Sequence, residues 1–292
     1  MNLLIRVRHE QNSKICARYP TLNMSNILDK IFADKQKELA GTKSKLPLPE
    51  AKKRIGDQAP VRDIFKELKG GNSSRIIAEI KRRTPFKGEL RGNFNAGEIA
   101  GDYARNGAAT LSILTESNYF GSHIGILEEV RPIAPIPLLR KDFIFDEYQV
   151  YESRAYGADL FLLIATWLEQ NQLKDLLCLG MELGLPALVE THNEYDMEKA
   201  FEAKANLIGI NNRDLTNGKT DLGIARRLIP MALQESGKTL VCESGISGRE
   251  EIEEFEKMGA HAFLIGESLM TSKNIPEKLK ELLGNGESTS KG

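Results

Sequence analysis

The sequence has few of the residues that cross-link a chain or bind a metal. Of its 292 residues only three are cysteines, and Cys16, Cys178 and Cys242 lie far apart with no CxxC spacing. We therefore expect no disulfide framework, no metal site and a reducing, cytoplasmic setting. Cys242 lies in an apolar run, which predicts a small core residue. The four histidines are scattered, and each of them, His192 included, is interpreted as a surface or helix residue.

An excess of one charge and a long hydrophobic run are also missing. Forty Lys and Arg stand against 41 Asp and Glu, a net charge of −1. This balance gives no reason to expect a nucleic acid or an anionic membrane as partner. No apolar run is long enough to span a bilayer. With 41% hydrophobic residues, the composition is typical of a globular chain of one large α/β domain or two smaller ones.

The first 23 residues lack the apolar core and small-residue cleavage site of a secretory signal. Their basic character leaves a transit peptide as an alternative. Met24 opens the run MSNILDKIFADKQKEL, which looks like a natural start. We therefore expect residues 1–23 to be a disordered or non-native extension. At the other end, a polar run of small residues predicts a disordered tail over residues 285–292.

Helices are expected before any strand. Over Ile27–Leu39, apolar residues recur at helical spacing with charged residues on the other side. A polar connection containing Pro47 and Pro49 follows, and the run VRDIFKEL predicts a second, short helix. We assign residues 24–71 to a helical extension that packs on a catalytic domain formed by residues 72–284.

Beyond Gly71 short aliphatic runs alternate with longer amphipathic stretches. The runs begin about 20–35 residues apart, which is the size of a strand, a helix and two loops. Several are apolar on both faces, as in strands covered by helices. The eight predicted strands are Ile76–Ile80, Thr110–Leu114, Pro137–Arg140, Leu160–Ile164, Ala187–Val189, Leu207–Ile210, Thr239–Cys242 and Ala262–Ile265.

The stretches between these runs carry helix signals. Four of them end in a glycine immediately before the next strand, in NGAATL, YGADLF, LGLPAL and MGAHAF, which is typical of a left-handed helix C-cap. Ser247 begins SGRE, which predicts a capping box with Glu250. Eight such units predict an α/β fold, a closed (β/α)8 TIM barrel with an N-terminal helical extension. The alternative is an open doubly wound sheet, which usually has a glycine fingerprint after its first strand, and KRRTPFKG has none.

Charged side chains follow most of the predicted strands. In a barrel the carboxyl ends of the strands meet at one face. Glu79 and Lys81 are two residues apart and so share one face of the first strand. If that face points inward, they converge with Lys141, Glu190 and Glu243. Each residue alone could simply begin a solvated loop. Five charged residues at the ends of predicted strands are better explained by a shared site.

The chemistry of this set is that of Lys and Glu acting as general acids and bases. No serine lies in a GxSxG motif, and no His and Asp are spaced as metal ligands. After the last two strands, ESGIS and IGES place small residues ahead of helices, where backbone N–H groups can bind a phosphate. The alternative is that these glycines only make tight turns.

An ordered set of motifs extends this interpretation. The segments IIAEIKR, LTESNYFGS, LLRKDFI, ALVETHN, IGINNRDL, ESGIS and FLIGESLM resemble, in order and spacing, those of the indole-3-glycerol-phosphate synthase family. The resemblance extends from about Asn26 to Leu283. It implies conversion of 1-(2-carboxyphenylamino)-1-deoxyribulose 5-phosphate to indole-3-glycerol phosphate in tryptophan biosynthesis. It also implies a carboxy-lyase that needs no cofactor and no metal.

The resemblance assigns roles to individual residues. Lys141 would be the general acid in ring closure, and Glu190 the general base or its partner in dehydration. Lys81 would contact the substrate carboxylate or phosphate and could serve as a second acid, and Glu79 would orient and balance the lysines. Substrate contacts are implied for Asn211, Arg213, Glu243, Ser244, Phe120, Phe143 and Leu215. Phosphate contacts are implied for Lys81, Gly245, Gly266, Glu267 and Ser268.

One segment departs from the family pattern. After the first strand the family usually has SPSKG, whereas this chain has Thr84 and Phe86 in TPFKG. Because this loop lies over the substrate in the family, its closure could differ. The alternatives to the resemblance are a phosphoribosylanthranilate isomerase, a Schiff-base aldolase using Lys141, and a non-catalytic phosphate-binding barrel. We expect a monomer or a weak homodimer with a small phosphorylated substrate.

Overall fold

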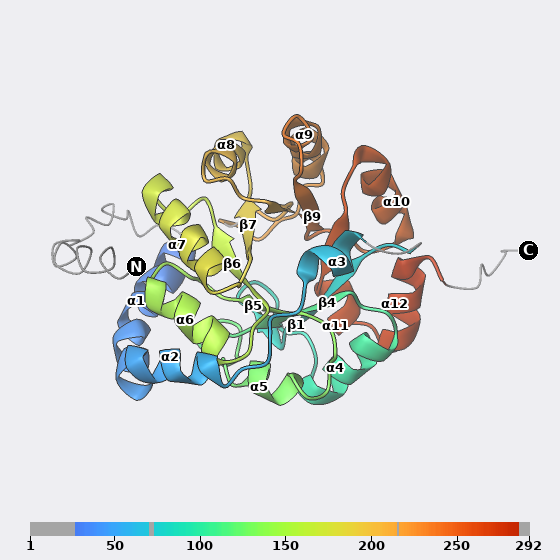
Figure 1. Cartoon of the computed structure of the whole chain (residues 1–292). Helices are drawn as coiled ribbons and strands as arrows, with labels where there is room; N and C mark the ends of the chain where they lie inside the picture. Colours follow the sequence, from blue (N-terminus) through green and yellow to red (C-terminus); the bar gives the residue numbers. More distant parts are fainter. Residues whose placement is uncertain (1–26, 70–72, 215, 286–292) are drawn as a thin grey trace, which may run out of the picture.

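A computed structural model of the chain describes residues 27–69, 73–214 and 216–285 (Figure 1). The expectations for residues 1–23, for Leu215 and for the tail beyond Asn285 lie outside the described residues. Within them, eight parallel strands form a closed barrel in the order β1-β10-β9-β8-β7-β6-β5-β4. Pairing of β1 with both β10 and β4 closes the barrel. The predicted (β/α)8 fold is therefore confirmed.

The barrel strands agree closely with the predicted ones. They are β1 Ile76–Ile80, β4 Thr110–Leu114, β5 Leu138–Lys141, β6 Leu160–Ile164, β7 Ala187–Thr191, β8 Leu207–Asn211, β9 Thr239–Glu243 and β10 Ala262–Ile265. The differences lie mostly at the carboxyl ends. There β5, β7, β8 and β9 continue through polar residues that the apolar pattern had left outside. Polar residues that were expected to follow these strands therefore belong to them.

Helices surround the strands (Figure 1). They are α4 Ala96–Arg105, α5 Ile126–Val130, α6 Glu147–Ala155, α7 Gln170–Glu182, α8 Glu194–Glu202, α9 Gly223–Ala232, α10 Arg249–Met258, α11 Glu267–Met270 and α12 Ile275–Leu283. Four glycines predicted to end the stretches between strands have positive φ values. These are 96° for Gly107, 82° for Gly157, 65° for Gly184 and 109° for Gly259. Since glycine alone adopts this region without strain, it allows the chain to turn directly into the next strand.

The predicted capping box of α10 is displaced by one residue. Gly248, not Ser247, is the N-cap, and its N–H donates to Glu251 Oε2 at 2.8 Å. The side chain of Ser247 instead donates to Glu251 Oε1 at 3.2 Å. The pattern SGREE contains two adjacent glutamates, so the local sequence could not distinguish the two registers.

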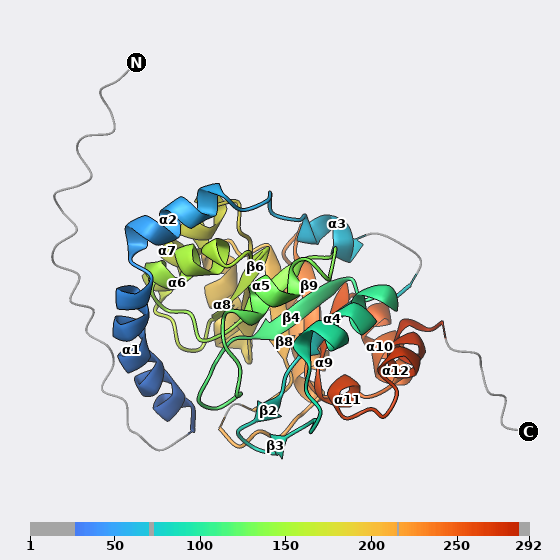
Figure 2. The ribbon, with the colours of Figure 1, turned by 90° about the horizontal axis from the view of Figure 1, so that it is seen from below.

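The N-terminal extension consists of three helices, α1 Ile27–Lys45, α2 Leu48–Gly56 and α3 Ile64–Lys69. The expected polar connection at Pro47–Pro49 is wrong, because Pro47 is the N-cap of α2 and Pro49 lies in its first turn. Proline is well tolerated there, since the first N–H groups of a helix have no partner within it. Figure 2 shows α1 and α2 beside α6 and α7, while α3 lies at one end of the barrel.

Because successive side chains of a strand point to opposite faces, the apolar residues form two cores, one under the helices and one inside the barrel. In β1, Ile76, Ala78 and Ile80 pack under the surrounding helices, whereas Ile77 belongs to the cluster inside the barrel. That inner cluster also contains Ile64 and Leu68 of α3. Burial of each of these two side chains contributes about 1.5–3 kcal/mol. Apolar residues thus close one end of the barrel and leave the other for polar side chains.

A short hairpin follows β1 at that other end. Its strands are β2 Arg83–Thr84 and β3 Gly88–Glu89, and they pair in an antiparallel manner. In Figure 2 this hairpin lies at the end of the barrel opposite α3. The hairpin was not predicted, because its strands of two residues are too short to show any hydrophobic alternation.

Candidate active site

A pocket opens at the carboxyl ends of the barrel strands, and most of the predicted site residues line it. They are Glu79, Lys81, Phe120, Lys141, Phe143, Glu190, Asn211, Arg213, Glu243, Ser244, Gly245, Gly266 and Glu267. The side chain of Ser268 does not line the pocket, since its hydroxyl donates to the carbonyl of Ile246 at 3.4 Å. Residues from seven different strands or the loops after them therefore meet at one cavity.

Lys141 lies at the centre of this set. Its Nζ is 2.7 Å from Glu190 Oε2 and 2.9 Å from Glu243 Oε2. Glu190 and Glu243 are buried, and Lys141 is partly buried with 14% of its side chain exposed. The three residues come from β5, β7 and β9, where alternation points them into the barrel. Burial disfavours the charge of Lys141, but Glu190, Glu243 and Glu79 outweigh it and raise the lysine pKa above its ordinary value.

The two carboxylates that contact Lys141 differ in their protonation. Burial alone would raise the pKa of Glu190, yet Lys141 and His192 hold it well below the ordinary value. Burial raises the pKa of Glu243 to about 8, against the attraction of Lys141 and with the help of its neighbour Glu190. The cluster thus combines a charged ammonium group with one carboxyl group whose pKa is lowered and one whose pKa is raised. Carboxyl groups whose pKa values are shifted in opposite directions are typical of acid–base sites.

Two glycines make room for the buried carboxylates. A Cβ atom at Gly209 in β8 would collide with the carboxylate of Glu243, and one at Gly266 would collide with that of Glu79. Glu79 in turn pairs with Lys81. Gly209 was not singled out from the sequence, although a glycine within the strand LIGIN signals a close approach. Gly266 has this packing role whether or not it also binds phosphate.

The rim of the pocket contains two further cations close together. Glu267 pairs with Lys87 from the hairpin and with Arg213, whose Nη2 lies 3.4 Å from its carboxylate. Burial acts to raise the pKa of Glu267, and Lys87, Arg213 and Lys81 lower it below the ordinary value. Lys87 was missed in the sequence because the hairpin that brings it to Glu267 was not predicted.

Aromatic side chains also line the pocket. The rings of Phe120 and Phe143 lie 6.3 Å apart, and Phe143 stacks on Trp167 at 5.1 Å. Phe120 is held by its own loop, where Glu116 accepts hydrogen bonds from the backbone N–H groups of Asn118, Tyr119 and Phe120. Glu116 therefore shapes the loop, and the geometry explains why a buried carboxylate follows β4.

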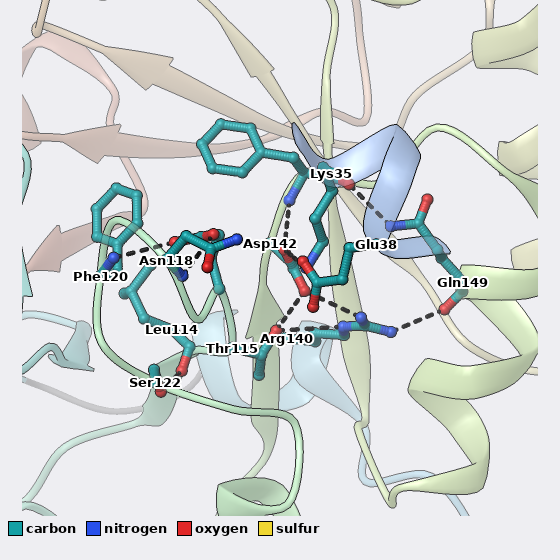
Figure 3. Close-up of polar contacts among 12 residues, drawn as sticks. Lys35, Glu38, Leu114, Thr115, Asn118, Phe120, Ser122, Arg140, Asp142 and Gln149 are labelled. Carbon is teal, nitrogen blue, oxygen red and sulfur yellow. Dashed lines mark hydrogen bonds and ion pairs between the residues drawn. The ribbon is translucent and has the colours of Figure 1, made fainter. Parts of the chain in front are cut away.

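A charge network involves the two residues next to Lys141 in the sequence, and Figure 3 shows Asp142 with Lys35, Arg140 and Thr115. Asp142 contacts Lys35 of α1 at 3.0 Å, Arg140 at 2.9 Å and the hydroxyl of Thr115 at 2.7 Å. Arg140 continues to Glu152 of α6 at 2.8 Å. Because alternation directs Arg140 away from the barrel interior, this network anchors both residues that flank Lys141. It also ties the N-terminal extension to the catalytic strand.

His192 was wrongly interpreted as a surface or helix residue. It follows β7, and its Nε2 lies 3.3 Å from Glu190 Oε1, with only 10% of its side chain exposed. Burial opposes its charge, but Asp196 and Glu190 raise its pKa to about 9. The available signal was its position two residues beyond Glu190, which places both on the same face of an extended chain.

Among residues 27–69, 73–214 and 216–285 there is no group of three or more His, Cys, Asp or Glu that could hold a metal ion. In that same part of the chain, no helix combines the length and the apolar character needed to cross a membrane.

Comparison with known proteins identifies the family. The sequence profile described as "Indole-3-glycerol phosphate synthase" matches residues 28–282. The chain belongs to the indole-3-glycerol phosphate synthase family. The synthase of Dehalococcoides mccartyi strain CBDB1 is 43% identical over 88% of this chain and all of its own length. That of Neisseria meningitidis serogroup B is 41% identical over 89% of the chain and all of its own length.

Solved structures outside the synthase family share the fold alone. A 3-hexulose-6-phosphate synthase aligns with a TM-score of 0.58 at 15% identity, covering 73% of this chain and all of that one. An N-acetylmannosamine-6-phosphate 2-epimerase from Clostridium perfringens aligns with a TM-score of 0.56 at 13% identity, covering 72% of this chain and 92% of that one. The resemblance of the motifs to the indole-3-glycerol phosphate synthase family is thus confirmed. The barrel fold itself also occurs in proteins outside this family.

Proposed function

We propose that this chain converts 1-(2-carboxyphenylamino)-1-deoxyribulose 5-phosphate to indole-3-glycerol phosphate, a step of tryptophan biosynthesis. Family membership supports the reaction, and the observation that carries the assignment of roles is the contact of Lys141 with both Glu190 and Glu243 inside the pocket. A decarboxylating lyase of this kind needs an acid, a base and a binding site for an anionic substrate. All three requirements correspond to side chains of this pocket.

Lys141 acts as the general acid of ring closure. As the ring carbon that bears the carboxylate attacks the sugar carbonyl carbon, the carbonyl oxygen takes a proton from the Lys141 ammonium. Loss of CO2 then restores the aromatic ring. The two carboxylates keep Lys141 protonated in the resting enzyme, and this favours an acid over a nucleophile. A Schiff-base aldolase would instead need the neutral amine.

Glu190 acts as the general base of the dehydration. It is ionised in the resting enzyme, so it can accept the proton from the carbon next to the new hydroxyl group. The hydroxyl leaves as water with a proton supplied by Lys81, which also lines the pocket. Glu79 orients Lys81 through the ion pair between them. Exchange with solvent then returns the proton held by Glu190 to Lys81, and Lys141 recovers its proton from solvent, so that the whole reaction takes up one proton.

The substrate lies between the aromatic side chains and the cationic rim. The anthranilate ring packs on Phe120 and Phe143, and Asn211, Arg213 and Ser244 contact the sugar chain. The phosphate is bound by backbone N–H groups of Gly245, Gly266, Glu267 and Ser268, aided by Lys81. Ser244 and Gly245 support this placement, because their φ values of 63° and 80° turn the backbone at the pocket edge.

The direct test is turnover. Purified protein is mixed with the synthetic substrate, and formation of the fluorescent indole product is followed together with CO2 release. We expect both products in equal amounts. A chain that binds the substrate but releases neither would support the non-catalytic barrel and overturn the proposed function. Labelling of Lys141 by borohydride in the presence of substrate would favour the aldolase alternative.

Phe86 provides a test of the unusual loop. Its ring lines the pocket, is 41% exposed and packs on Gly218. We expect Phe86→Ser to raise KM about fivefold, the loss of roughly 1 kcal/mol of binding, with little change in kcat. Steady-state kinetics checks this, with Tyr195→Ser as the control because Tyr195 is 69% exposed and absent from the pocket. Unchanged KM in Phe86→Ser would show that this loop does not contact the substrate.

A further inference from the structure

A line of polar side chains leads from Glu190 out of the pocket. Glu190 Oε2 contacts Lys141, while its other oxygen, Oε1, lies 3.3 Å from His192 Nε2. On the far side of the imidazole, Nδ1 lies 3.1 Å from the Thr166 hydroxyl and 3.7 Å from Asp196 Oδ2. The four residues come from β7 with its following loop, α8 and the loop after β6. His192 does not itself line the pocket.

The contacts of Thr166 fix where the imidazole protons lie. A threonine hydroxyl has one hydrogen, and Thr166 donates it to Asp196 Oδ2 at 2.6 Å. Its contact with Nδ1 therefore uses a lone pair of the hydroxyl, and Nδ1 must carry a hydrogen. Nε2 faces a carboxylate oxygen, which only accepts. The surroundings of both ring nitrogens thus favour hydrogens on both, which is the imidazolium cation.

We propose that His192 is a positioning residue for Glu190, holding the outer carboxylate oxygen as an imidazolium so that Glu190 stays ionised and aimed at Lys141 and the substrate. The inference rests on the proposed function of Glu190 as the base. Asp196 and Thr166 hold the imidazole in turn. Asp196 is itself fixed, because it accepts from the backbone N–H of His192 at 3.1 Å.

The alternative is that His192 only fills space at the start of α8. The two readings differ in their pH dependence. The charged groups that face His192 are Glu190 from β7 and Asp196 from α8, and those that face Glu190 besides His192 are Lys141 and Glu243. Removing the imidazolium takes one of two cations from Glu190, so the Glu190 pKa rises. A space-filling role predicts no such shift.

The test is the pH profile of kcat/KM for His192→Gln. We expect the acidic limb to move to higher pH by about one unit, the lower range for loss of an opposite charge at contact distance. Activity at neutral pH should change much less than activity in acid, because a Glu190 pKa that starts well below its ordinary value leaves the carboxylate ionised there. Asp196→Asn should move the limb in the same direction by less. The matched control is His123→Gln, since His123 is exposed in the loop after β4 and should leave the profile unchanged. An acidic limb of His192→Gln that coincides with that of the wild type overturns the inference.

A second measurement does not depend on turnover or on a stable His192 variant. Titration of the imidazole resonances by NMR should give His192 a pKa near 9 in the wild type and a clearly lower one in Glu190→Gln. A His192 pKa that is the same in both proteins contradicts the inference. Failure of the proposed function appears differently, as a Glu190→Gln enzyme with wild-type turnover or a wild-type chain that forms no product.

Discussion

Replacing Lys141 by alanine is expected to lower kcat by about 1,000-fold or more, within the range that a general acid contributes. Lys141 is the group between Glu190 and Glu243, and the other lysine that lines the described pocket is Lys81. Lys81 is engaged with Glu79, on a different strand. Product fluorescence under substrate saturation measures the effect. Turnover of Lys141→Ala near the wild-type value would contradict the assigned role.

The fold should survive this substitution. Without the ammonium group, Glu190 and Glu243 can share one proton, because the pKa of Glu243 is already raised to about 8. We expect an unchanged circular dichroism spectrum. Lys43→Met is the matched control, since Lys43 pairs with Asp146 at the surface and lies outside the pocket. Its kcat should equal that of the wild type.

Replacing Asp142 by alanine is expected to have the largest effect on stability, a loss of about 3–5 kcal/mol. The substitution would leave Arg140 and Lys35 buried without their shared carboxylate. Arg140 keeps Glu152, but Lys35 keeps only the more distant Glu38 at 3.5 Å. Urea denaturation measures the free energy of unfolding. Asp102→Ala, which removes only an exposed pair with Arg105, should cost less than about 1 kcal/mol.

The same substitution should change the response to acid. Burial acts to raise the pKa of Asp142, but Lys35 and Arg140 hold it below its ordinary value of 3.8. A depressed pKa of a carboxyl group stabilises the fold above that ordinary value, and this stabilisation is lost as the pH falls toward the folded-state pKa. Between about pH 5 and pH 3, the wild type should therefore lose stability more steeply than Asp142→Ala. Parallel curves would show that Asp142 carries no such linkage.

The sequence pattern predicted much of the fold because its signals are local. Buried β-branched and aliphatic runs predicted all eight barrel strands, and the glycines after the intervening stretches predicted where the chain turns back. The pattern failed where polar residues belong to strands, as at Asn211 and Glu243. It also failed at Pro47 and Pro49, where proline begins a helix instead of a connection. In the first case burial in the barrel overrode the local preference, and in the second the prolines occupy the start of a helix, where proline is tolerated.

The site was predicted in outline for a related reason. Parallel strands in a barrel must end at one face, so Lys81, Lys141, Glu190 and Glu243 could be expected to meet from their positions alone. The partners outside the strand ends could not. Lys87 reaches Glu267 through the unpredicted hairpin, and Lys35 reaches Asp142 from α1. Such contacts depend on how helices and loops pack, which no local pattern encodes.

By itself the sequence determined the barrel, its family and the residue types of the pocket, because period, turn chemistry and motif order are properties of neighbouring residues. The tertiary structure alone decided how these residues are charged. Lys141 meets carboxylates 49 and 102 positions further along the chain. Their burial and mutual distance, which exist only in the folded barrel, lower the pKa of Glu190 and raise that of Glu243.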